Sequence, residues 1–147
     1  MILKHGDYLS YELPKNWTAE EDDDNLLIYN PDGNGSVTVS FFNILDSSVF
    51  LDEYVSIFAK KFIDKNNIKM HSPLILLTKE GKTVLSGTGT ESDGWFIKLW
   101  VVAKYPKIVF ATYLSERKNR EVKICDSIIE SMKFILWVDL LLLHSAV

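Results

Sequence analysis

The fold is decided by residues 74–114, which read LILLTKEGKTVLSGTGTESDGWFIKLWVVAKYPKIVFATYL. They hold four segments rich in apolar and β-branched residues, at positions 74–78, 82–90, 95–104 and 107–114. The separators, Glu80-Gly81, Ser92-Asp93-Gly94 and Tyr105-Pro106, have the composition of tight turns. Because short connections can join only antiparallel neighbours, these residues predict a four-strand antiparallel meander.

The preceding residues predict three further strands. Residues 7–13 form an opening strand that ends at Pro14. Residues 26–30 and 37–42 flank a turn-forming cluster at 31–36, which indicates a hairpin. The acidic stretch 20–24 is expected to be a solvated loop, because five like charges in succession repel one another.

Two segments change to the helical period. Within residues 46–66 the apolar stripe is Leu51, Tyr54, Val55, Phe58 and Phe62, preceded by the candidate N-caps Asp46, Ser47 and Ser48. After Ser115, which is expected to cap the second helix, the stripe is Val122, Cys125, Ile129, Met132 and Leu136. The sequence thus predicts an α+β fold with an antiparallel sheet of about six to seven strands. Because each helix has a single apolar stripe, both are expected to cover the same face of this sheet.

Composition limits the classes of protein that fit. A chain of 147 residues suits one domain, which we assign to residues 1–135, with an apolar tail at 136–147. The net charge of −4 disfavours nucleic acid as a partner, since phosphates require a basic surface. No apolar leader and no run long enough to span a bilayer is found, so a cytoplasmic location is expected.

Motifs that would carry chemistry fail on inspection. The stretch from Asp32 starts like a calcium loop but has Val37 where glycine is needed and Asn43 where glutamate is needed. The three histidines, His5, His71 and His144, have no metal-ligating residues beside them. The single cysteine, Cys125, is expected to be a buried and inert thiol. We therefore expect no catalytic residue, no metal and no cofactor.

The order of elements and one short phrase resemble a known group. Leu13-Pro14-Lys15-Asn16-Trp17 is similar to a Leu-Pro-x-x-Trp phrase common in the PsbP/Mog-like superfamily, which includes bacterial families of unknown function. The hairpin, central helix, meander and closing helix follow the same plan. The resemblance implies an α+β fold and a protein of binding or assembly, without catalytic residues. It supplies no binding residue that can be carried over.

Two features suggest contact surfaces. Residues 95–105 are apolar on both strand faces, so the face that bears Phe96, Lys98 and Trp100 needs a cover, which is a second layer, a partner or a ligand. The tail segment Leu136–Leu143, with Trp137, is too apolar to lie in water. It is expected to pack on the domain or on a partner, including a second copy. The candidate binding residues are Phe96, Lys98, Trp100 and Trp137.

Three functions remain open from the sequence. The favoured one is a non-enzymatic module that contacts another protein through the aromatic sheet face. The second is a small-ligand-binding or enzymatic domain with a pocket between sheet and helices. The third is a structural homodimer that associates through Leu136–Leu143.

Overall fold

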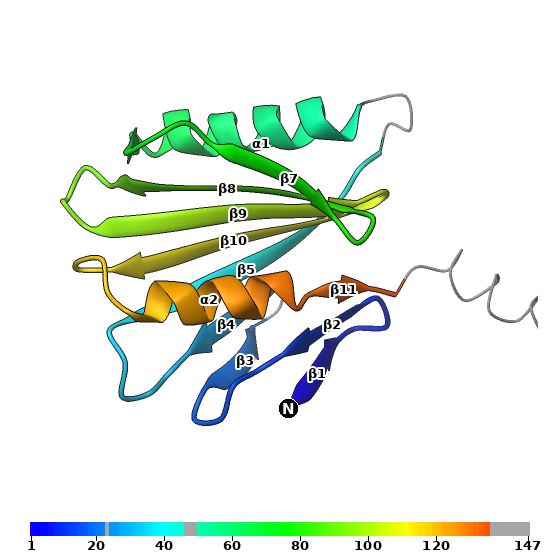
Figure 1. Ribbon diagram of the computed structural model, residues 1–147, viewed down its shortest axis with the longest axis horizontal. Coiled ribbons are helices and arrows are strands. Elements are labelled where there is room, and N and C mark those ends of the chain that lie inside the picture. The colour runs from blue at the N-terminus through cyan, green and yellow to red at the C-terminus, as the bar shows by residue number, and fades with distance from the viewer. Residues whose placement is uncertain (23, 46–49, 136–147) are drawn as a thin grey trace, which may run out of the picture.

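A computed structural model describes residues 1–22, 24–45 and 50–135. The predicted α+β class is confirmed, with two helices and two antiparallel sheets (Figure 1). The large sheet runs, from one edge, through β3 (Thr18–Asp22), β4 (Asn25–Tyr29), β5 (Gly35–Asn43), β10 (Lys107–Ser115), β9 (Phe96–Lys104), β8 (Lys82–Thr90) and β6 (Lys69–Met70). A further strand, β7 (Ile75–Lys79), also pairs with β8. The small sheet is β1 (Ile2–His5), β2 (Leu9–Glu12) and β11 (Lys133–Phe134).

The predicted meander is present as β7, β8, β9 and β10. Each strand pairs antiparallel with the next, and the observed bounds differ from the predicted ones by a residue or so. The predicted hairpin is β4 and β5, which pair from Asn25 opposite Ser40 to Tyr29 opposite Ser36. Turn composition and alternating side chains therefore located these strands correctly.

The first three residues of the acidic stretch 20–24 lie in a strand, not in a loop. Thr18–Asp22 forms β3, the edge strand of the large sheet, and pairs with β4. Glu20, Glu21 and Asp22 are nevertheless exposed. Backbone pairing with β4 holds the strand, while its position at the edge keeps the carboxylates in water, where their repulsion is weak.

The two helices cover opposite faces of the large sheet, so the expectation of a single covered face is wrong. Helix α1 (Leu51–Lys65) buries Val55 and Ala59 against Leu99 and Val101 of β9. Helix α2 (Glu121–Glu130) packs with the small sheet over the other face, in a cluster that contains Phe96, Trp100, Val102, Val122, Cys125 and Leu9. Figure 1 shows the helices separated by strands β8, β9 and β10. A sheet whose central strands are apolar on both faces needs a cover on each.

The small sheet explains three departures from the predicted elements. Strand β1 pairs with β2, and β11 pairs with β2 through Lys133 opposite Ser10 and Phe134 opposite Leu9. The helical pattern that was extended to Leu136 therefore stops at Glu130, and the chain continues as a strand. Helix α1 follows Phe50 and α2 follows Arg120, neither with a side-chain cap, so Ser115 does not cap α2. The cap candidates Asp46, Ser47 and Ser48 lie outside the described residues.

A buried lysine closes the C-terminal end of α2. The Lys82 side chain is 4% exposed, and its Nζ donates hydrogen bonds to the carbonyl oxygens of Glu130 and Met132. Glu130 is the last residue of α2 and Met132 follows the C-cap, so neither carbonyl has a partner within the helix. Burial lowers the pKa of Lys82. Its position at the start of β8 joins the closing helix to the meander.

No helix in the described ranges is long and apolar enough to cross a membrane. The predicted tail, residues 136–147, lies outside the described residues.

Two buried titratable groups of the core predict how the free energy of unfolding changes at alkaline pH. Burial raises the pKa of Cys125 from 9.0 to about 12 and that of Tyr113 from 10.0 to about 12. Between pH 9 and 12 the folded protein thus holds protons that the unfolded chain releases, so these groups make the free energy of unfolding fall as pH rises. Urea unfolding at pH 8, 9 and 10 should show a smaller fall for Cys125→Ala than for the unaltered protein. The same fall in both proteins would contradict this origin.

Candidate functional site

The structure places two of the predicted binding residues inside the protein. Phe96 and Trp100 are 5% and 2% exposed, and both lie in the cluster covered by α2. The cover that this strand face needs is therefore supplied by the chain itself. Lys98 lies between them on β9 and is partly exposed, whereas Trp137 is outside the described residues. The Phe96 and Trp100 side chains are therefore covered within the described structure.

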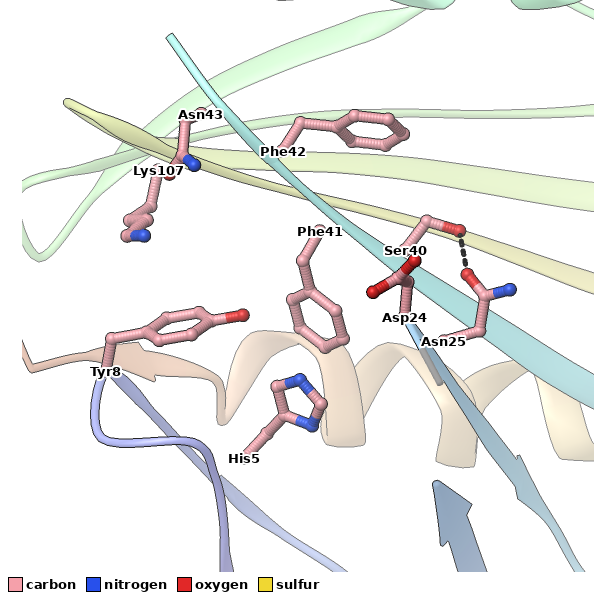
Figure 2. A pocket seen from close by; sticks show the side chains of 9 residues that line it. All are labelled: His5, Tyr8, Asp24, Asn25, Ser40, Phe41, Phe42, Asn43 and Lys107. Atoms are coloured by element: carbon pink, nitrogen blue, oxygen red, sulfur yellow. Dashed lines mark hydrogen bonds between the residues drawn. The ribbon is translucent and has the colours of Figure 1, made fainter. Parts of the chain in front are cut away.

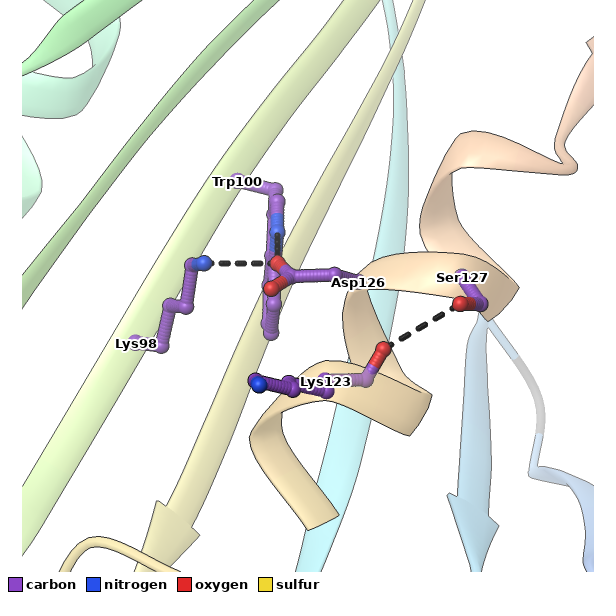
Figure 3. A network of polar contacts seen from close by, with 5 residues as sticks. All are labelled: Lys98, Trp100, Lys123, Asp126 and Ser127. Atoms are coloured by element: carbon purple, nitrogen blue, oxygen red, sulfur yellow. Dashed lines mark hydrogen bonds and ion pairs between the residues drawn. The ribbon is translucent and has the colours of Figure 1, made fainter. Parts of the chain in front are cut away.

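Lys98 and Trp100 meet on one carboxylate of α2 (Figure 3). The Asp126 Oδ1 atom lies 2.6 Å from Lys98 Nζ and accepts a hydrogen bond of 2.9 Å from Trp100 Nε1. The Lys98 ammonium also lies 5.3 Å from the centroid of the Trp100 ring. An ion pair with this cation–π contact is partly shielded from solvent, because the Lys98 side chain is only 16% exposed. These contacts fix α2 against β9.

A basic groove lies beside this ion pair. It has a volume of about 770 Å³ and is lined by Thr88, Lys98, Lys118, Asn119, Arg120, Val122, Lys123 and Asp126. Four of the lining residues are cations and one is an acid, which is already paired with Lys98. Within the described residues, Lys118, Arg120 and Lys123 form no ion pair. Basic residues therefore outnumber acidic ones in its lining, in a chain whose net charge is −4.

The loop that carries Lys118 and Arg120 is held by polar contacts. Ser115 Oγ and Asn119 Nδ2 both donate to the carbonyl oxygen of Arg117, at 2.7 and 3.1 Å. Asn119 Oδ1 in turn accepts a 2.8 Å hydrogen bond from the backbone N–H of Glu121. The side of the groove formed by this loop is therefore fixed in place before any ligand binds.

Glu121 is a buried carboxylate at the start of α2, and its contacts show an anchoring role. Its Oε1 atom accepts hydrogen bonds from the backbone N–H groups of Asn34 and Gly35, each 3.0 Å, and from the Tyr113 hydroxyl at 2.8 Å. The other oxygen, Oε2, has no hydrogen-bond partner among the described residues. A Cβ atom on Gly33 would lie 1.9 Å from Oε2, so this turn position requires glycine for lack of space.

A second depression lies between the two sheets (Figure 2). This polar cleft has a volume of about 520 Å³ and is lined by His5, Tyr8, Asp24, Asn25, Ser40, Phe41, Phe42, Asn43 and Lys107. The His5 ring stacks on Phe41 with centroids 4.0 Å apart, and His5 Nδ1 lies 2.9 Å from Glu21 Oε1. Lys107 Nζ lies 4.5 Å from the centroid of the Tyr8 ring. Burial, and secondarily the charge of Glu21, raises the pKa of Tyr8.

Sequence reasoning missed the environment of His5 because its partners are distant along the chain. The residue was expected to be isolated, but β1 brings it to Glu21 of β3 and Phe41 of β5. His71 Nε2 lies 2.7 Å from Thr90 Oγ1, and the His71 ring centroid lies 6.2 Å from that of Phe96. His144 lies outside the described residues. No group of three metal-ligating side chains that could hold an ion occurs in the described part of the chain.

Substitution of Glu121 should separate anchoring from surface charge. Replacement by alanine leaves two backbone N–H groups and the Tyr113 hydroxyl without their acceptor, and should lower the free energy of unfolding by about 3 kcal/mol. The matched control is Glu130→Ala, an exposed glutamate on the same helix, which should change it by less than about 0.5 kcal/mol. Urea unfolding at pH 7 measures both. Equal effects of the two substitutions would contradict the anchoring role.

Comparison with known proteins identifies the fold. No family model matches the chain, and no curated protein matches it in sequence. A similar solved structure is the solution structure of cyanobacterial PsbP (CyanoP) from Synechocystis sp. PCC 6803. The likeness has a TM-score of 0.66 and covers 92% of each chain, at 12% sequence identity. The chain therefore has a PsbP-like fold, in agreement with the resemblance found in its sequence.

Proposed function

We propose that this protein is a non-enzymatic binding module whose basic groove takes an acidic segment of a partner protein. The observation that carries the proposal is the convergence of Lys98, Lys118, Arg120 and Lys123 on one groove. These residues come from β9, from the loop before α2 and from α2 itself, so the fold assembles the charge.

Local charge supports an acidic partner. The acidic residues Glu20, Glu21 and Asp22 lie on β3. This strand forms one edge of the large sheet, and β8 lies near the opposite edge. A positive groove on a protein of net negative charge selects its partner by local complementarity, because charges more than about 10 Å apart are screened at physiological salt. Nucleic acid is a poor candidate, since its dense phosphates would also meet the negative remainder of the surface.

The groove also offers apolar contact. Val122 and the aliphatic stems of the lysines line it together with the charged groups. A peptide in which acidic residues alternate with apolar ones can present carboxylates to the ammonium groups and side chains to these stems. We therefore favour such a mixed segment over a purely acidic one.

The proposal modifies the expected contact surface and keeps one of its residues. Lys98 lines the groove, while Trp100 lies beneath it and holds Asp126 in position. Association through the aromatic sheet face and homodimerisation through Leu136–Leu143 stay predictions, as does a cytoplasmic location.

A second candidate is the binding of a small polar molecule in the polar cleft. The stacked His5 and Phe41 rings offer a flat surface, and Asp24, Asn25 and Lys107 provide charged and polar groups around it. The cleft lies between the two sheets, not between sheet and helices as the sequence-based alternative supposed. Groove substitutions leave the cleft intact and so distinguish the two candidates.

Charge reversal in the groove tests the proposal. The probe is a fluorescein-labelled ten-residue peptide of alternating Glu and Leu, and its uncharged counterpart has Gln in place of Glu. The double substitution Lys118→Glu and Lys123→Glu should raise the Kd of the acidic peptide at least about tenfold, since two attractive contacts become repulsive. Fluorescence anisotropy at 50 and 300 mM NaCl measures the binding, which should weaken at the higher salt.

The matched control is Lys60→Glu with Lys61→Glu, which changes the net charge equally on the exposed side of α1. It should leave the Kd of the acidic peptide within about twofold of that of the unaltered protein, a range that includes the effect of the changed net charge. The proposal fails if both double variants weaken binding equally. It also fails if the Gln peptide binds with the same Kd as the Glu peptide. A third contradicting result is that inorganic phosphate displaces the Glu peptide with a Kd equal to that of the peptide.

A further inference from the structure

The polar cleft lies where β5 extends past its neighbour β4. Strand β4 pairs with β5 only as far as Asn25 opposite Ser40, whereas β10 pairs with β5 as far as Lys107 opposite Asn43. Within the described part of the chain, residues 41–43 therefore have a strand neighbour on one side only. All three of them line the cleft. The cleft is thus a short stretch of open strand edge.

Two backbone N–H groups point to this open side. The N–H of Ile44 donates a 2.7 Å hydrogen bond to the carbonyl oxygen of Pro106, directly before β10. Because backbone groups alternate from one side of a strand to the other, the N–H and C=O groups of Phe41 and Asn43 point away from β10. Among the described residues, no strand pairs with these groups on that side. They offer donors and acceptors about 7 Å apart, as an edge strand does.

Unpaired charges of opposite sign mark the two ends of the cleft. Figure 2 shows Lys107 beside Asn43 at one end and Asp24 beside Ser40 at the other. Neither Lys107 nor Asp24 forms an ion pair within the described residues. The Lys107 ammonium lies 4.5 Å from the centroid of the Tyr8 ring, a contact that positions its charge without neutralising it. Since the two ends are three residues apart along β5, they are separated by about 10 Å.

We propose that the polar cleft binds a free tripeptide, with its ammonium group beside Asp24 and its carboxylate beside Lys107. This inference rests on the second candidate function, the binding of a small polar molecule in the cleft, and not on the basic groove. An extended tripeptide spans about 10 Å, which matches the separation of the charged ends. The cleft volume of about 520 Å³ is in the range of small-ligand sites.

The charged ends set the direction of the peptide. With its carboxylate at Lys107, the tripeptide runs in the same direction as β5. In a parallel pair of this kind, the N–H of Phe41 donates to the first carbonyl oxygen of the peptide, and the N–H of Asn43 donates to its terminal carboxylate. The carboxylate then receives both a hydrogen bond and the charge of the Lys107 ammonium.

The aromatic side of the cleft favours an apolar residue at the centre of the peptide. In the parallel pairing the central residue lies opposite Phe41, and side chains opposite each other share a face of the sheet. The Phe41 ring stacks on His5 with centroids 4.0 Å apart, and Tyr8 meets Phe41 edge-on at 6.0 Å. Figure 2 shows these three rings along one side of the cleft. Their carbon surface removes an apolar side chain from water.

Isothermal titration calorimetry with alanyl-leucyl-alanine tests the proposal. The N-acetylated peptide lacks the ammonium charge, and the C-terminal amide lacks the carboxylate charge. Each should have a Kd at least about tenfold higher than that of the free tripeptide, because one charged contact is lost. Equal Kd values for the three peptides overturn the proposal. The absence of saturable binding of the free tripeptide up to about 10 mM also overturns it.

Two substitutions distinguish contact with the peptide from support of the fold. Lys107→Met should raise the Kd of the free tripeptide at least about tenfold, but that of the amide less than about twofold, because the amide has no carboxylate to lose. Asp24→Asn should raise the Kd of the free tripeptide in the same way and leave that of the N-acetylated peptide within about twofold. The matched control, Lys60→Met on the exposed side of α1, should leave all three Kd values within about twofold. A substitution that raises the Kd of all three peptides alike acts through the fold, and this result overturns the proposal.

Crossed measurements separate this inference from the binding of an acidic peptide in the basic groove. Lys118→Glu with Lys123→Glu should leave the Kd of the free tripeptide within about twofold. Lys107→Met should likewise leave the Kd of the Glu and Leu peptide within about twofold. Either site can therefore fail while the other holds. If the groove variant weakens tripeptide binding as much as Lys107→Met does, the tripeptide does not bind in the cleft and the proposal is overturned.

Discussion

The burial of β9 on both faces is the constraint on which the rest of the structure depends. Leu99 and Val101 face α1, while Phe96 and Trp100 face α2 and the small sheet. A strand with large apolar side chains on both sides is stable only where two layers exclude water from it. The order of the chain follows from this need, since one helix is supplied before the meander and one after it. The short strands β1, β2 and β11 complete the second layer.

Local patterns were sufficient to predict most of the large sheet but not the arrangement of its layers. Short turns and alternating residues located β4, β5 and β8 to β10, because the signal for each lies within a few residues. The side on which each helix packs depends on the path of the whole chain, and a single apolar stripe does not record it. The apolar residues on both faces of 95–105 contained the missing information, since they required two covers. Strand β11 was missed because its partner, β2, lies at the other end of the sequence. Strand β1 forms a local hairpin with β2 around Gly6, and this hairpin was not predicted from the sequence.

The candidate site was predictable in part. Lys98 and Trp100 were selected from the sequence, but their actual relation, through Asp126, depends on the packing of α2 on β9. The lysines and arginine of the groove look scattered along the chain, and this scatter concealed a local concentration of charge. Lys98 lies twenty residues before Lys118, and only the meander and the following turn bring them together. The same reasoning applies to His5, whose partners lie on β3 and β5.

The carboxylate of Asp126 has a consequence for observing the groove. One oxygen of this side chain contacts both the Lys98 ammonium and the Trp100 indole N–H. An anionic group that draws Lys98 towards itself weakens one of the two contacts and leaves more of the carboxylate's charge acting on the indole. The emission of an indole depends on the electric field across its ring, so Trp100 is a natural optical reporter of the state of its neighbour. Under the proposed function, the emission of Trp100 is therefore expected to change when the groove is occupied, against the constant signal of the chain's three other tryptophans.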